Sequence, residues 1–354
     1  MLKRLLLITL TLLPMAAAAQ YGVGDWRLHP SFVASAVQNC VDAGNEVYYL
    51  ASNNLFRFDK ETSENEALNK RNYLSDMTIS NIYYNYDKNY LVVAYANSNL
   101  DFIMSDGRVL NMPEIKDAVL TVDKQINDIT FSGDNVYVAT SFGFVIIDDT
   151  RMEVRQSRIF NYPVFSVAKV GQWLLLSYNT SRLYYCPASE VAERITDFTV
   201  CGDFSIQQMH IYPLTDSKFL LTGKDTSRSV AIADDGSGNL TFTATEFETA
   251  TPDNVQRFSN GFILNYATSG YYYTTNGEGG NPLKNNGGNE YYSCKPGENT
   301  VWALGGNGLH RMGDNTNYYK PNGIDLAEQI LAKYPHTNII YVIVYKNERT
   351  KQCR

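Results

Sequence analysis

The strongest constraint on the fold is an internal repeat with a spacing of about 40 residues. Each copy has a polar turn, a strand of alternating aromatic and aliphatic residues, a small residue, a second turn and a second strand. The copy at 134–148, DNVYVATSFGFVIID, shows the pattern most clearly. Seven copies are present, and their first strand residues are Val47, Tyr90, Val136, Trp173, Phe219, Phe262 and Val301. The intervals between them are 43, 46, 37, 46, 43 and 39 residues.

This spacing predicts an all-β fold, a seven-bladed β-propeller of four-stranded antiparallel blades spanning residues 20–323. A propeller blade repeats every 40–45 residues or so, whereas helical repeats are shorter and have a 3.6-residue period that is almost missing here. Further short strands precede four copies, at 79–84, 126–131, 164–168 and 208–212. The turns between them contain Asp-Gly, Asn-Gly or Gly-Asp-Asn, which tolerate the positive φ of tight hairpins.

Three segments depart from the repeat. Residues 1–19 combine Lys3 and Arg4 with an apolar run and four alanines, which predicts a secretory signal peptide cleaved before Gln20. Residues 274–289 are rich in glycine and asparagine and predict a mobile loop between blades six and seven. Residues 324–354 contain a helical pattern at 326–332 and an apolar run at 338–345. We expect this last segment to be a linker and the incomplete start of a second propeller.

Charge argues against nucleic acid as a partner. The net charge is −7, and removal of the two cations in the signal peptide takes it to about −9. An acidic chain without a basic cluster cannot displace the counterions of a phosphate backbone. No later run is apolar enough to span a bilayer. Of the five cysteines, Cys186 and Cys201 are the only close pair; a disulfide between them and two separate buried thiols both remain open, the second being favoured.

The sequence predicts no catalytic, cofactor-binding or metal-ligating residues and no cofactor. None of the histidines has a second ligand at metal spacing, and we interpret His210, on a strand, as a packed or edge residue; the four are His29, His210, His310 and His336. Gly223-Lys224 interrupts a strand and is no phosphate loop. The GEGG run at 277–280 has no helix after it.

Three remaining patterns have structural explanations that are favoured over functional ones. The oxygen-rich run Asp234 to Asn239 is compared with a calcium loop, but it lacks the terminal glutamate, so a hairpin turn is favoured. Asp148-Asp149 is interpreted in the same way. The 26 tyrosines suit half-buried strands. Runs such as Tyr83-Tyr84 and 271–273 should still place at least one ring outward on each strand, which would support binding without naming a ligand.

Two resemblances follow from the repeat text. Ile126-Asn127-Asp128-Ile129, followed by VYVATSFGF from Val136, resembles the two-component regulator propeller repeat. Residues 21–177 are more specifically similar to the amino-terminal propeller of the PorZ family, accessory proteins of the type IX secretion system. The likeness rests on these strings: GDWRLHPSF at 24–32, VYYLASNNLFRFDKET from Val47, LNKRNYLSDMTISNIYYN from Leu68, KDAVLT from Lys116 and INDITFSGDNVYVATSFGFVIIDD from Ile126.

The PorZ resemblance implies a non-enzymatic binding or scaffold protein that is exported to the periplasm or the outer membrane surface. Its partners would be the other type IX proteins that process cargo and attach it to anionic lipopolysaccharide, and the lipopolysaccharide itself is a further candidate. Members of that family continue into a second propeller and a sorting domain, so we expect this chain to be a fragment. The alternative is the ligand-sensing propeller ectodomain of a hybrid two-component regulator. An enzyme such as a polysaccharide lyase would need a cluster of His, Tyr, Arg or metal ligands that the sequence does not reveal.

Overall fold

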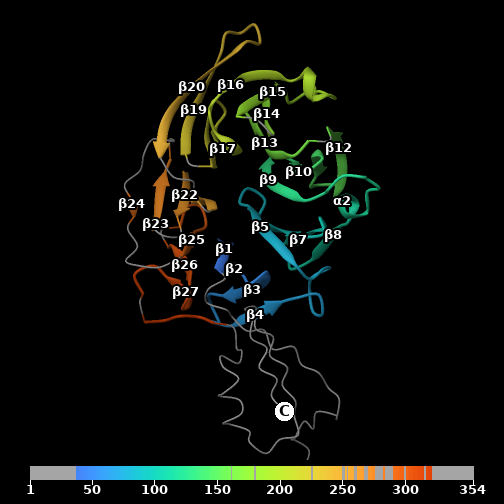
Figure 1. The fold of residues 1–354 in the computed structure, drawn as a ribbon. Coiled ribbons are helices and arrows are strands. Elements are labelled where there is room, and N and C mark those ends of the chain that lie inside the picture. The colour runs from blue at the N-terminus through green and yellow to red at the C-terminus, as the bar shows by residue number, and fades with distance from the viewer. Residues whose placement is uncertain are drawn as a thin grey trace, which may run out of the picture. The chain divides into compact units, whose positions relative to one another are not determined.

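The computed structural model shows strands arranged as blades of a ring (Figure 1). It describes residues 37–320 apart from 161, 179–180, 225, 249–251, 253, 259–260, 267–269, 276–281, 284–289, 299 and 315. The predicted signal peptide at 1–19 and the predicted linker at 324–354 lie outside the described residues, as do His29, His336 and the GEGG run. The limits 20–323 for the propeller therefore remain a prediction.

The described strands form seven antiparallel sheets, each built from consecutive strands. Blade one contains β1 (Val37–Asp42), β2 (Glu46–Ala51), β3 (Asn54–Asp59) and β4 (Asn65–Leu68). Blade two contains β5 (Ile79–Asn85), β6 (Tyr90–Tyr95), β7 (Leu100–Met104) and β8 (Val109–Met112), followed by the short helix α2 (Glu114–Asp117). Blade three contains β9 (Ile126–Ser132), β10 (Asn135–Thr140), β11 (Gly143–Asp148) and β12 (Glu153–Ile159).

The second half of the chain repeats this order. Blade four contains β13 (Val164–Val170), β14 (Trp173–Tyr178), β15 (Arg182–Pro187) and β16 (Thr199–Asp203), with the 3₁₀ turn η3 (Ile195–Asp197) before β16. Blade five contains β17 (Gln207–Thr215), β18 (Lys218–Lys224), β19 (Thr226–Asp234) and β20 (Leu240–Glu248). Blade six contains β21 (Asn254–Phe258), β22 (Gly261–Tyr266), β23 (Gly270–Thr274) and β24 (Pro282–Leu283). Blade seven contains β25 (Tyr291–Ser293), β26 (Trp302–Gly305) and β27 (Gly308–Arg311).

The repeat therefore predicted the fold class correctly. Six of the seven first strand residues fall in the second strand of their blade, and Val301 directly precedes β26. The short strands predicted at 79–84, 126–131, 164–168 and 208–212 lie in the first strands β5, β9, β13 and β17. Gly223-Lys224 lies at the end of strand β18, as expected.

The structure adds two details to the blade prediction. Blade seven has three described strands, and only the bridge between Leu309 and Tyr319 marks the fourth position. Within the predicted loop at 274–289, Pro282–Leu283 forms β24, which pairs with Tyr271 and Tyr272. This pair is the one apolar step in a polar segment, and a proline is tolerated there because the outermost strand of a blade needs hydrogen bonds on one side only. The rest of 276–289 lies outside the described residues.

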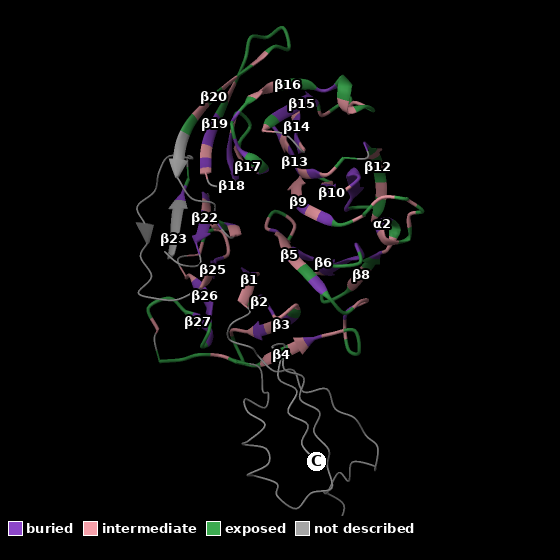
Figure 2. Ribbon diagram, in the orientation of Figure 1, coloured by how far each residue is buried: buried purple, intermediate pink, exposed green. Residues whose placement is uncertain are grey.

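The hydrophobic core is divided into seven clusters, one between each pair of neighbouring blades. Strands such as β6 and β11 are buried along their whole length because both faces of a blade are covered by its neighbours (Figure 2). Each fully buried large apolar side chain contributes about 1.5–3 kcal/mol. Stability is thus distributed around the ring.

Blade seven lies beside blade one, and among the described residues the two blades share no strand. Phe58 of blade one packs against Trp302, with ring centroids 5.3 Å apart, and against Tyr319 at 4.3 Å. The backbone N–H of Asp42 donates a hydrogen bond of 2.9 Å to Ser293 Oγ. Side-chain packing and hydrogen bonds therefore join the described parts of blade seven and blade one.

The cysteine alternative is settled in favour of separate thiols. Cys186 and Cys201 are both free. Cys186 packs into the cluster between blades three and four, whereas Cys201 packs against the cluster between blades four and five. The two side chains lie on opposite faces of one sheet, which excludes a bond between them.

No helix among the described residues is long and apolar enough to cross a membrane.

Candidate functional site

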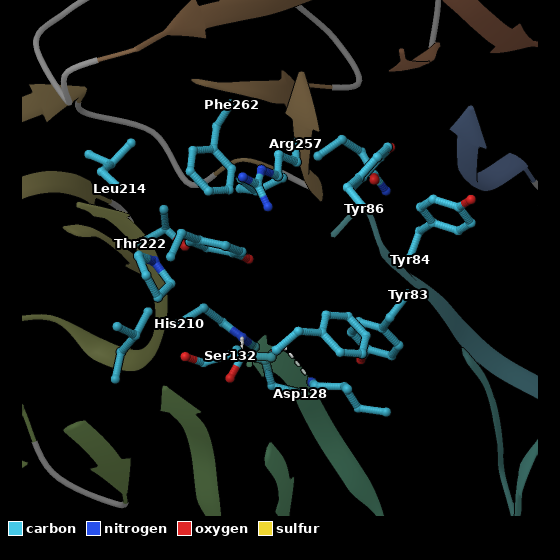
Figure 3. A pocket seen from close by; sticks show the side chains of 18 of the residues that line it. Tyr83, Tyr84, Tyr86, Asp128, Ser132, His210, Leu214, Thr222, Arg257 and Phe262 are labelled. Carbon is cyan, nitrogen blue, oxygen red and sulfur yellow. Dashed lines mark hydrogen bonds and ion pairs between the residues drawn. The ribbon is translucent and has the colours of Figure 1, made fainter. Parts of the chain in front are cut away.

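The first strands of the blades surround a central cavity of about 830 Å³. Its walls come mainly from β5, β9, β17 and β21, with single residues from β1 and β13 and two residues each from the second strands β18 and β22 (Figure 3). Because these strands start on one side of the ring and end on the other, the cavity has an end lined by the strand starts and an end lined by the strand ends. We call this space the central cavity.

Amide side chains line the end where the strands start. Asn39 is buried, and its Oδ1 accepts hydrogen bonds from Asn254 Nδ2 at 2.5 Å and Gln256 Nε2 at 2.6 Å. Its Nδ2 donates to Asn81 Oδ1 and to the carbonyl of Ile82, both at 3.1 Å. One amide thus connects blade one with blade two and, past blade seven, with blade six.

An ion pair crosses the middle of the central cavity. Nδ1 of His210, from blade five, lies 3.3 Å from Oδ2 of Asp128, from blade three, so the pair passes over blade four. Burial alone would lower the pKa of His210, but the Asp128 carboxylate outweighs it and the pKa lies above its ordinary value. Nδ1 faces the carboxylate, so the attraction between a protonated His210 and Asp128 is electrostatic, and the geometry does not form a hydrogen bond to Asp128 Oδ2.

Two tyrosines flank Asp128. Burial, followed by the charge of the Asp128 carboxylate, raises the pKa of Tyr83, and the same two causes raise the pKa of Tyr212. Both phenols are therefore neutral at physiological pH and act as hydrogen-bonding groups. Figure 3 shows Tyr83 and His210 on different sides of the central cavity, with Asp128 below them.

A second pair spans the end where the strands finish. Arg257 Nη1 of blade six lies 3.0 Å from Asp87 Oδ1 of blade two, so this contact reaches past blades seven and one. Lys169 of blade four also lines this end. The cations and anions of the central cavity are therefore largely matched, which gives it a polar character without a strong net field.

We expect the His210–Asp128 pair to make stability depend on pH. The folded pKa of His210 exceeds its ordinary 6.5, so the pair stabilises fully below about pH 6.5 and loses its contribution as pH rises through the folded pKa. His210→Gln should lower Tm by about 2 °C near pH 6 and by much less near pH 9, a small effect because solvent screens the pair. Thermal melts at both pH values measure it. Asp128→Asn should reproduce the pattern, and a pH-independent loss in both variants would contradict it.

The sequence missed the His210–Asp128 pair. Sequence reasoning interpreted His210 as a packed or edge residue, whereas the structure places it in the central cavity. The signal that could have found it is positional, because both residues lie on the first strand of their blades, β17 and β9.

His310, on β27, is buried with Nε2 3.2 Å from Glu290 Oε1.

The expectation of outward tyrosine rings is corrected for Tyr83 and Tyr84. Tyr83 packs towards blade three and Tyr84 towards blade one, and both rings are half-buried and line the central cavity. The rings do alternate, but the neighbouring blades partly cover both faces of this first strand, so what remains accessible of the two rings faces the central cavity. The side chains at 271–273 lie outside the described part of the chain.

The acidic runs have the structural roles that were favoured. Asp235 Oδ1 accepts hydrogen bonds from the backbone N–H groups of Ser237 and Asn239 in the β19–β20 hairpin turn. Asp148 ends β11 and accepts from the N–H groups of Thr150 and Arg151 at 3.0 Å each. No cluster of potential metal ligands occurs among the residues that the structure describes.

Comparison with known proteins shows which family this chain resembles. Residues 47–199 match the family described as the TSS9, PorZ, N-terminal beta-propeller domain. The PorZ resemblance is confirmed. PorZ of Porphyromonas gingivalis, described as an essential bacterial surface component of the type IX secretion system, has a similar structure with a TM-score of 0.66 and 20% identity over 81% of this chain and 38% of PorZ. The present chain thus spans 38% of the PorZ chain.

A second solved β-propeller also has a similar structure. The β-propeller domain of Cps50 (Swd1) from Myceliophteria thermophila matches with a TM-score of 0.54 and 13% identity, covering 78% of this chain and 94% of that one. No curated protein sequence matches the chain. Because the sequence identities are low, the structural matches support only the fold. The similarity to the PorZ family rests on the family match at residues 47–199.

Proposed function

We propose that this chain is an exported, non-catalytic component of a type IX secretion system that works at the bacterial surface as a binding module. The observation that carries the proposal is the match of residues 47–199 to the PorZ N-terminal propeller domain. The similar PorZ structure is described as a surface component of that system. The partners would be the proteins that process cargo and attach it to anionic lipopolysaccharide, and the lipopolysaccharide itself would be a ligand.

The chemistry of the central cavity favours binding over catalysis. A lyase-type site needs a group that removes a proton, and His210, Tyr83, Tyr212 and Arg257 do line this one cavity. However, the raised pKa values of Tyr83 and Tyr212 keep the phenols neutral, and Asp128 favours the protonated state of His210. A rise in the pKa of a histidine makes its neutral, proton-accepting form less abundant, which disfavours a role in proton abstraction.

Deletion of the gene, followed by complementation, tests both parts of the proposal. The deletion strain should lose cargo proteins from its surface, measured by surface biotinylation, and the wild-type gene should restore them. The double variant Tyr83→Phe, His210→Gln should restore them equally, because neither group performs chemistry. Normal surface cargo in the deletion strain would contradict the secretion role. A folded double variant without surface cargo would contradict the non-catalytic role.

A further inference from the structure

Strand β20 of blade five differs from the other outer strands. With 9 residues it is the longest, whereas β4 and β8 have 4, β16 has 5 and β24 has 2. Strand β12 has 7 residues, but charged side chains of Glu153, Arg155 and Arg158 interrupt it. In Figure 1 the β19–β20 hairpin projects beyond the neighbouring blades at the top of the view.

In an antiparallel pair, hydrogen-bonded and non-hydrogen-bonded residue pairs alternate, so the pattern in this hairpin shows which backbone groups of β20 point away from β19. The N–H of Asp235 donates to the carbonyl of Asn239, and the register pairs Ala231 with Thr243 and Ile232 with Phe242. The N–H of Ile232 donates to Ser217 on the β18 side, so the Ile232–Phe242 pair is not hydrogen-bonded. By the same alternation, the N–H and C=O groups of Phe242 and Ala244 point away from β19.

No described strand pairs with that edge, since β20 is the last strand in its sheet. An unpaired edge of this length is a template for another strand, and proteins usually protect such edges with lysine, proline, bulges or short strands. Residues 240–245, LTFTAT, contain neither lysine nor proline. The side chains of Thr241, Thr243 and Thr245 are exposed in a row along it.

The acidic residues near the free edge of β20 indicate what kind of strand could pair with it. The exposed carboxylates of Asp234 and Asp235 lie at the hairpin end, and the strand finishes with Glu246 and Glu248 in its sequence. The sequence of the hairpin and β20 therefore has an uncharged centre between acidic residues, which complements a strand that is uncharged in its centre and basic at its ends. Two copies of β20 paired antiparallel would instead bring the acidic ends of one copy beside those of the other.

We propose that the free edge of β20 binds an extended segment of a partner protein, with β-branched residues in its centre and lysine or arginine at its ends, as a fifth strand of blade five. Main-chain hydrogen bonds to Phe242 and Ala244 would supply affinity, and Thr241, Thr243 and Thr245 would contact β-branched side chains of the partner. This interaction surface is separate from the central cavity and goes beyond the secretion role proposed above.

The test uses the full chain and a synthetic peptide of alternating threonine and valine with two lysines at each end. Calorimetry should show binding to the wild type, and Ala244→Pro should weaken it at least about tenfold, because proline removes an edge donor without breaking the β19 ladder. Ala244→Val keeps the N–H group and is the matched control. A peptide with glutamates in place of the lysines should bind at least about tenfold more weakly.

Hydrogen exchange provides a readout that needs no variant. The lysine peptide should slow exchange of the Phe242 and Ala244 amides and leave the central cavity strands unchanged. Absence of binding to the wild type, equal binding to folded Ala244→Pro, or equal binding of the glutamate peptide would overturn the proposal. Concentration-dependent dimerisation that protects the same two amides would overturn it too, because the occupant would then be a second copy.

Discussion

Gly143→Ala is expected to destabilise the propeller by at least about 3 kcal/mol. Gly143 begins β11 with φ of +147°, a conformation that side chains rarely adopt, and an added Cβ would lie 1.9 Å from the carbonyl oxygen of Arg158. That oxygen belongs to β12, which pairs with β11, so relief of the clash would separate two strands. Urea unfolding followed by tryptophan fluorescence measures the loss as a lower midpoint.

Gly133→Ala is the matched control. Gly133 also has a positive φ, +58°, but a Cβ there would meet nothing within 4 Å. Gly133→Ala should lower the free energy of unfolding by about 1–2 kcal/mol, because alanine disfavours the left-handed backbone conformation. If Gly143→Ala were no more harmful than Gly133→Ala, the close contact between β11 and β12 would not exist as described.

Asn39→Leu is expected to cost about 3 kcal/mol, which lowers Tm by about 6 °C for a domain of this size. All four hydrogen-bonding positions of the Asn39 amide are used. Leucine has a similar volume but leaves the amide of buried Gln256 and the carbonyl of Ile82 without this partner. Differential scanning calorimetry of the purified chain measures the change.

Asn239→Leu provides the comparison. Asn239 lies in the exposed hairpin turn, where it bonds only to Asp235. Surface changes of this kind usually alter stability by less than about 0.5 kcal/mol. If Asn39→Leu and Asn239→Leu lowered the stability by the same amount, the hydrogen bonds of Asn39 across the central cavity would contribute no more than those of an exposed asparagine.

The sequence predicted the blades because the information for a blade is local. Each repeat contains its own alternating strands and turns, so Val136 to Ile147 defines one hairpin without reference to the rest of the chain. The repeat motif itself proved to be structural. Thr140 Oγ1 donates to the carbonyl of Gly143, and Gly143 permits the close approach of β12.

The central cavity could not be predicted in the same way. Asp128 and His210 are 82 positions apart in the sequence, and Asp87 and Arg257 are 170 apart. Which side chains meet across the ring depends on how far each first strand extends towards the axis, and a repeat pattern does not contain that information. The sequence predicted that Tyr83 and Tyr84 point to opposite faces of their strand, which is correct. It did not show that a neighbouring blade packs against each of these faces.

The measurement that tests the central claim most directly is co-purification of the tagged chain from native envelopes after mild cross-linking. The proposed role predicts that proteins of the type IX attachment machinery and anionic lipopolysaccharide are recovered with it, and that a tagged periplasmic protein of similar charge recovers neither. Recovery of the folded chain alone would contradict a role in secretion and would leave only the PorZ-like fold.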